Sequence, residues 1–286
     1  MPGPLHGFTV LSLAPNLPGP LAAAALRDDG ARVVKVEPPG GDPFVDWAPE
    51  WYAELTRGVE VRRLDLKGAE GQGELRALLA ETDLLLTSSR PSALARLGLD
   101  GGALGRDFGR LCRVLIVGDT RTPEVPGHDL TYVAQAGLID PARPTMPRTL
   151  LADVLGGQRA YAAALALLLG RERGSPQRER VVGLGDAARA AAGPLRFGLT
   201  APGGLLSGAS PTYRLYATAD GTVAVAALEA HFAARFHEVF GPDPEATLRS
   251  HPTAHWLAVA RDHDLPLAAV PGEARAAPPS SPFRSG

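Results

Sequence analysis

Asp153, His128 and Glu229 are the side chains in this sequence whose types and surroundings suit proton transfer. Asp153 stands near the start of a predicted apolar helix, and Gly156 and Gly157 follow it on the same helix face. Two adjacent glycines weaken a helix, and they predict a space without side chains above the carboxylate, where a ligand could lie. The structural alternative is an aspartate that caps exposed helix amides.

His128 and Glu229 also stand at predicted helix starts. His128 precedes a helix that Asp129 would cap, and nearby helix amides would favour the neutral, basic imidazole. The alternative is an exposed loop histidine. Glu229 falls in a first helical turn, where an acid suits the helix dipole without further function. Taken singly, none of the three residues establishes a catalytic site.

Other motifs predict less. The segment 183–188 has the form G-x-G-x-x-A, but no acid occurs between Asp186 and Asp220, where a dinucleotide-binding turn needs one for the ribose. We therefore interpret it as an ordinary turn rather than a nicotinamide site. His251 and His255 are four residues apart without a third ligand, so no metal site is expected. The single cysteine, Cys112, lies in an apolar run typical of a buried strand.

Composition excludes further classes. The 29 basic and 31 acidic residues give a formal charge of -2, and the isoelectric point is near 6.4. Nucleic-acid and membrane-surface proteins need a basic field, so neither partner is expected. No apolar run approaches the roughly 20 residues of a membrane helix, and the first residues do not resemble a signal peptide. The sequence predicts a soluble, cytoplasmic protein.

The elements that must position these residues alternate in the first half of the chain, which indicates a parallel sheet covered on both faces. Strands are predicted at 8–13, 32–37, 83–87, 113–118 and 179–182, and helices at 19–28, 69–82 and 150–169. The second half predicts a hairpin, 213–218 with 222–227, and helices at 228–240 and 253–261. We predict a large domain (1–195), a linker (196–211), a small α+β domain (212–271) and a mobile tail (272–286).

Read together, many segments resemble the family III CoA-transferases (CaiB/BaiF) and, within that superfamily, the α-methylacyl-CoA racemases. The resemblance begins at the first residues, 5–13, and includes the stretch Lys-Val-Glu-Pro-Pro-Gly-Gly-Asp-Pro at 35–43. Matching blocks follow in order over most of the chain, at 5–13, 18–20, 29–43, 64–67, 90–91, 96–99, 126–129, 134–136, 152–153 and 216–229. The chain resembles a shortened, divergent member.

The resemblance implies a Rossmann-like α/β large domain with a parallel sheet, a smaller α+β domain, and an interlocked homodimer. Asp153 matches the catalytic aspartate. In the transferases this carboxylate attacks the acyl-CoA thioester; in the racemases it is one of two bases beside the α-carbon, and His128 with Glu229 matches the other base and its partner.

The resemblance also implies acyl-CoA as the substrate and no permanently bound cofactor, because CoA arrives as part of the substrate. Arg90 and Lys35 are candidates for ion pairing with CoA, and Gly156 and Gly157 for contact with it. Lys35 has the alternative of a solvated strand end. The resemblance favours racemisation of 2-methylacyl-CoA thioesters, and leaves open CoA transfer through Asp153 and a non-catalytic dimer that only binds CoA.

Overall fold

The computed structural model describes residues 2–272, and the contacts within this part divide it into two compact units, residues 2–191 and 192–272. The predicted mobile tail lies outside the described residues from 273 onward. The segment 197–212, which covers most of the predicted linker, holds no helix or strand. The domain limits drawn from the sequence remain predictions.

The first unit contains a six-stranded, fully parallel sheet in the order β3-β2-β1-β4-β5-β6. Its strands are β1 (Thr9–Ser12), β2 (Arg32–Glu37), β3 (Glu60–Arg63), β4 (Leu84–Thr87), β5 (Cys112–Val117) and β6 (Glu179–Gly183). This is the strand order of the Rossmann fold, in which the direction of winding reverses between β1 and β4. The predicted parallel α/β fold is thereby confirmed.

Both faces of the central strands are apolar because helices cover both sides of the sheet. Val10 and Leu84 belong to one buried cluster, whereas their strand neighbours Leu11 and Leu85 belong to a second cluster on the opposite face. Cys112 is buried in β5, as predicted. The pleat therefore divides the core of the first unit into two layers.

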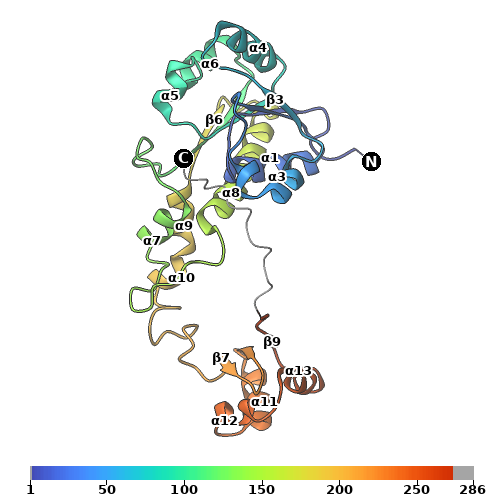
Figure 1. Cartoon of the computed structure of the whole chain (residues 1–286), viewed down its shortest axis with the longest axis vertical. Coiled ribbons are helices and arrows are strands. Elements are labelled where there is room, and N and C mark those ends of the chain that lie inside the picture. The colour runs from blue at the N-terminus through green and yellow to red at the C-terminus, as the bar shows by residue number, and fades with distance from the viewer. Residues whose placement is uncertain (1, 273–286) are drawn as a thin grey trace. The chain divides into compact units, whose positions relative to one another are not determined.

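Nine helices of this unit lie within the described residues: α1 (Pro18–Asp28), α2 (Phe44–Trp47), α3 (Pro49–Thr56), α4 (Ala69–Ala80), α5 (Pro91–Arg96), α6 (Gly101–Asp107), α7 (Asp129–Gln135), α8 (Leu151–Glu172) and α9 (Leu184–Ala191). Figure 1 shows α4, α5 and α6 grouped together, and their leucines join the cluster of Leu11. The long helix α8 and its neighbour α1 cover the other face, in the cluster of Val10.

The second unit contains an antiparallel sheet in the order β7-β8-β9 with short helices. Its elements are α10 (Gly193–Arg196), β7 (Tyr213–Ala217), β8 (Thr222–Ala226), α11 (Ala230–Phe240), α12 (Pro244–Arg249), α13 (Thr253–Asp262) and β9 (Leu267–Ala269). Phe236, Phe240 and Trp256 form the centre of its core. The hairpin and two of the helices were predicted from the sequence, whereas α12 and β9 were not.

None of the helices within residues 2–272 is both long enough and apolar enough to cross a membrane.

Candidate active site

The starts of helices α7 and α8 are tied together by one hydrogen bond. The backbone N–H of Asp153, in the first turn of α8, donates to the Asp129 carboxylate at 3.0 Å. Asp129 is the first residue of α7 and is buried, and His128 is the N-cap residue that precedes it. The fold thus brings the segments that carry His128 and Asp153 to one place, although 25 positions separate them in the sequence.

The Asp153 carboxyl group is partly buried and makes no hydrogen bond with the described residues. Burial raises its pKa to about 7, and the negative charge of Asp129 contributes to the rise. The structural alternative, an aspartate whose side chain caps the helix, is not observed. A carboxyl group that titrates near neutral pH can both take up and release a proton under physiological conditions.

His128 is exposed and lies in the wall of a polar pocket of about 200 Å³. Arg90, Ser89 and Tyr132 also line this pocket, which opens at the carboxyl ends of β4 and β5. The expectation that Asp129 caps α7 is wrong, because the Asp129 side chain is bonded to α8 instead. Thr131 fixes the backbone at His128, where its hydroxyl donates to the His128 carbonyl at 2.8 Å.

Gly156 and Gly157 do not clear a space for a ligand. A Cβ atom on Gly156 would overlap the side chain of Leu184, and one on Gly157 would lie 2.9 Å from the Pro18 carbonyl and 3.0 Å from the Leu21 side chain. Both glycines admit neighbouring helices, so the expected gap above Asp153 is filled by protein and that expectation is wrong. Their contact with CoA remains a prediction without this support.

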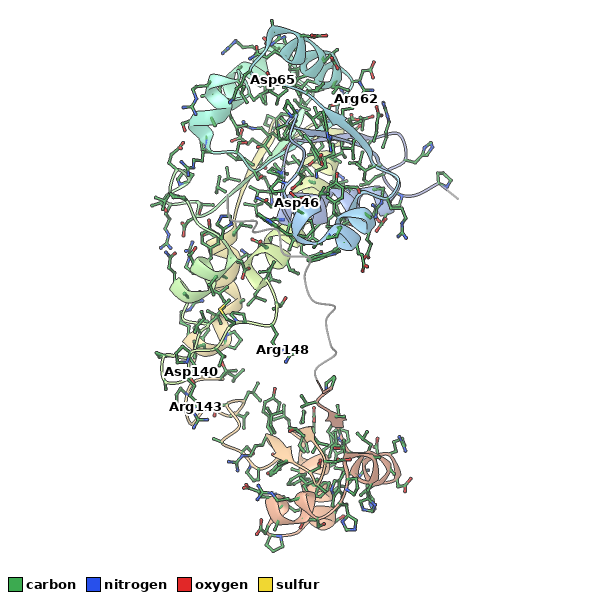
Figure 2. The ribbon with its side chains drawn as sticks, viewed as in Figure 1. Asp46, Arg62, Asp65, Asp140, Arg143 and Arg148 are labelled. Carbon is green, nitrogen blue, oxygen red and sulfur yellow. The ribbon has the colours of Figure 1, made fainter. Side chains whose placement is uncertain are left out.

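A second, larger cavity of about 880 Å³ lies at the carboxyl ends of β1, β2 and β3 and against α5. This is the edge of the sheet where Rossmann-like folds bind nucleotides. Its charged lining residues are Lys35, Glu37, Asp42, Asp65, Lys67 and Arg96. Asp65, labelled in Figure 2, follows β3, and its carboxylate accepts from the Lys67 backbone N–H at 3.0 Å.

Lys67 and Arg96 are the cations of this cavity that sequence reasoning did not single out, although both stand in blocks that carry the resemblance. Both are exposed, and neither forms an ion pair within residues 2–272. Their positions after β3 and in α5 could have identified them once the strand order was known, because the carboxyl ends of parallel strands share one edge of a sheet.

Lys35 is not a solvated strand end. It is buried, and its ammonium group lies 2.7 Å from Glu37 Oε1 and 2.6 Å from Asp42 Oδ2. Its charge is therefore already matched inside the protein. A contact between Lys35 and CoA would require these ion pairs to loosen, so Lys67 and Arg96 are better placed to meet an anion.

The other residues and motifs considered in the sequence are Glu229 and the segment 183–188. Glu229 is the N-cap residue of α11 in the second unit, where its side chain is exposed and does not cap the helix. In the G-x-G-x-x-A segment, the Asp186 side chain occupies the space beside Gly183 and accepts from the Thr120 backbone N–H at 3.1 Å, so the turn packs on protein. Within residues 2–272, no three His, Cys, Asp or Glu side chains are grouped to hold a metal ion.

Comparisons with known proteins agree on one family. The model of CoA-transferase family III matches residues 5–261. Alpha-methylacyl-CoA racemase of Homo sapiens is 33% identical over 245 residues, which cover 80% of this chain and 62% of the racemase. Succinyl-CoA:glutarate CoA-transferase of Mus musculus is 30% identical over 189 residues, which cover 59% of this chain and 43% of the transferase. The chain thus spans less than two thirds of each relative.

A solved structure agrees with the fold. The crystal structure of a mutant of Rv3272 from Mycobacterium tuberculosis superposes with a TM-score of 0.82 at 25% sequence identity, covering 95% of this chain and 83% of that one.

Proposed function

The chain belongs to CoA-transferase family III, and on that premise we propose that it racemises 2-methylacyl-CoA thioesters by exchanging the α-proton between His128 and Asp153. The observation that carries this proposal is the hydrogen bond from the Asp153 backbone to the Asp129 carboxylate, because it holds the two acid/base residues at adjoining helix starts. The resemblance of the 126–129 and 216–229 blocks to the racemases supports the same activity.

The chemistry requires two groups in opposite protonation states. One group takes the α-proton from one face of the carbon beside the thioester, and the other returns a proton to the opposite face. The Asp153 carboxyl group, with its pKa raised to about 7, suits this exchange because both of its protonation states are populated near neutral pH. Glu229 remains a predicted partner of His128.

The two cavities of the first unit suit a long ligand. Ser89 lies in the walls of both the 880 Å³ cavity and the 200 Å³ pocket, so they adjoin at the end of β4. We place the nucleotide end of CoA in the larger cavity, where Lys67 and Arg96 can meet its phosphates. The thioester end then reaches the pocket lined by His128 and Arg90.

CoA transfer is the second candidate, favoured by the match to a transferase. In that reaction the Asp153 carboxylate attacks the thioester carbonyl carbon, the CoA thiolate leaves, and a mixed anhydride forms on the aspartate. The thiolate then attacks the Asp153 carbonyl carbon of the anhydride, which releases the first acid and leaves a CoA thioester on Asp153. The carboxylate of a second acid displaces CoA from this thioester, and the thiolate attacks the acyl carbonyl carbon of the new anhydride, which forms the product thioester and frees Asp153. The raised pKa of Asp153 suits proton transfer, which uses both the protonated and the ionised form, whereas the nucleophilic route uses the ionised form alone.

Incubation with a single-handed 2-methylacyl-CoA in heavy water tests the proposal. Racemisation incorporates deuterium at the α-carbon and produces the opposite enantiomer. If deuterium is absent and CoA appears on an added carboxylic acid, the transferase is correct instead. If the protein binds CoA and does neither, it is a non-catalytic CoA-binding protein.

A homodimer is part of the proposal. It is supported by large exposed apolar side chains in the segment 197–212, among them Phe197 at 80% and Leu205 at 61% exposure, which a second chain could cover. Sedimentation should give a particle of two chains, and a monomer at micromolar concentration would contradict this part.

A further inference from the structure

The Tyr132 hydroxyl group occupies a space that two glycines leave open. A Cβ atom on Gly118 would overlap the hydroxyl oxygen, and one on Gly127 would lie 2.6 Å from it. Gly118 follows β5 and Gly127 precedes His128, so glycines on both sides of one loop accommodate the phenol. The ring itself packs in a buried cluster with Val133 and Ala152.

The Tyr132 hydroxyl makes no hydrogen bond with any residue in the part of the chain that the structure describes. The residue is only 7% exposed, but its hydroxyl oxygen is not among the fully buried atoms without a partner, so the hydroxyl is accessible while the ring is buried. Burial raises the pKa of the phenol, and the charges of Asp153 and Asp119 add to the rise. The group therefore stays protonated near neutral pH and is available as a donor.

The surroundings of the hydroxyl identify the partner it lacks. Tyr132 lies one helical turn after His128, and both line the same polar pocket of about 200 Å³. Ala152, which directly precedes Asp153, packs in the same buried cluster as the Tyr132 ring, so Asp153 also lies near. A carbon atom that exchanges its proton between His128 and Asp153 would hold its thioester group beside this hydroxyl.

We propose that the Tyr132 hydroxyl donates a hydrogen bond to the thioester oxygen of the bound acyl-CoA. This inference rests on the proposed function. When the α-proton leaves, negative charge develops on the thioester oxygen, and a fixed donor in a small pocket stabilises that enolate more than the neutral thioester. The phenol keeps its proton throughout, so Tyr132 stabilises charge without acting as an acid.

The test is the rate of α-deuterium exchange in the Tyr132→Phe variant, which keeps the ring and removes the hydroxyl. We expect kcat to fall about 100-fold with KM little changed, because the lost interaction is stronger in the transition state. The midpoint of thermal unfolding should not move, since the hydroxyl has no partner within the protein. Tyr161→Phe is the matched control: Tyr161 lies in α8 and donates to Asp29, so its loss should leave kcat unchanged.

The outcomes separate the two proposals. If the wild-type protein exchanges the α-proton and the Tyr132→Phe variant exchanges it equally fast, the role of Tyr132 is refuted and the proposed function stands. If the wild-type protein exchanges no α-proton, the proposed function fails and this inference fails with it. A rise in KM alone would also refute the inference, because it would indicate equal binding of the ground and transition states.

A double substitution tests where the hydroxyl lies. Because the added methyl group of Gly118→Ala meets the hydroxyl oxygen first and the next ring atom at 3.1 Å, this change should lower the unfolding midpoint of the wild-type protein more than that of the Tyr132→Phe variant. Equal losses in both backgrounds would contradict the position from which the donor role is argued.

Discussion

Two groups of buried ionisable side chains in the first unit have opposite electrostatic surroundings. In one group, Lys35 is paired with Glu37 and Asp42 at 2.7 and 2.6 Å, and all three side chains are at most 4% exposed. In the other, Asp153 is partly buried beside a second carboxylate, Asp129, and forms no ion pair with any residue between 2 and 272. The first group pairs its one cation with two carboxylates, although Glu37 Oε2 has no hydrogen-bond partner among the described residues, whereas the second keeps a carboxyl group whose ionisation is costly.

The comparison separates structural from reactive charges. A buried ion pair offsets its desolvation through its partners, so removing one member leaves an uncompensated charge and endangers the fold. A buried acid without a counter-ion instead has its pKa moved toward the pH at which proton transfer is useful. Both groups lie in sequence blocks that carry the resemblance to the family. Their surroundings, rather than the sequence match, distinguish them.

Asp153→Asn is the variant with the largest expected effect, and it tests whether Asp153 is reactive. The change removes the acid/base group and keeps its size, so α-deuterium exchange should fall about 10⁴-fold. Stability should not fall, because no ion pair is lost. Glu37→Gln is the contrasting variant and should lower the unfolding midpoint. Exchange that persists in Asp153→Asn at the wild-type rate would remove Asp153 from the mechanism.

Lys35→Met tests the structural group. It leaves Glu37 and Asp42 buried without their cation, so the free energy of unfolding should fall by about 3 to 5 kcal/mol. Lys67→Met is the matched control, because Lys67 is the other lysine of the sequence and is exposed; its effect on stability should be below about 0.5 kcal/mol. Urea unfolding measures both, and equal values for the two lysines would contradict the contrast.

The pH dependence of the free energy of unfolding tests the surroundings of Asp153. The folded-state pKa of Asp153 is raised from 3.8 to about 7, so the folded protein holds this proton where the unfolded chain has released it. Its contribution to stability is therefore present below pH 3.8 and is lost as the pH rises through about 7. Unfolding measured from pH 5 to pH 8 should show this loss in the wild-type protein and not in Asp153→Asn.

The same group controls the rate. Because the productive enzyme holds one proton between Asp153 and His128, kcat/KM should follow the same bell-shaped pH profile for both enantiomers, with the Asp153 titration near pH 7 setting the midpoint of one limb. Asp129→Asn keeps an oxygen for the Asp153 backbone N–H and removes the neighbouring charge, so the midpoint should move to lower pH. An unmoved midpoint would show that Asp129 does not influence the titration.

The smallest expected effects concern the cavity cations. Lys67→Gln and Arg96→Gln each remove one exposed positive charge, so KM for acyl-CoA should rise about tenfold while kcat stays constant. The increase should shrink at high salt, since exposed charges are screened. Calorimetry with CoA measures the loss directly, and unchanged affinity in both variants would place the nucleotide elsewhere.

Much of the fold could be predicted from the sequence because the central strands are buried on both faces. The segment 83–87 holds three consecutive leucines, and 32–37 holds three valines, which have strong strand preferences. Strand β3 was missed since it lies at the sheet edge and reads Glu-Val-Arg-Arg, without a buried pattern. Strand β9 has three residues, and only its pairing with β8 makes it a strand.

The candidate site was predictable in part. The types and helix-start positions of His128 and Asp153 were evident in the sequence, but the reason given for Gly156 and Gly157 was wrong because their space is filled by Leu184 and by α1. Lys35 could not be recognised as buried, since only the turn after β2 brings its second partner, Asp42, back to the strand. The importance of Tyr132 was invisible, because it depends on Gly118 from a distant strand end.

The sequence by itself determined the periodic burial that makes a parallel α/β unit and the residue types available for proton transfer, since both depend on local composition and spacing. Only the tertiary structure decided which buried charges are paired and which are not, because the pKa of a carboxyl group depends on the neighbours that other segments bring to it. Asp153 and Lys35 differ in their electrostatic surroundings for that reason.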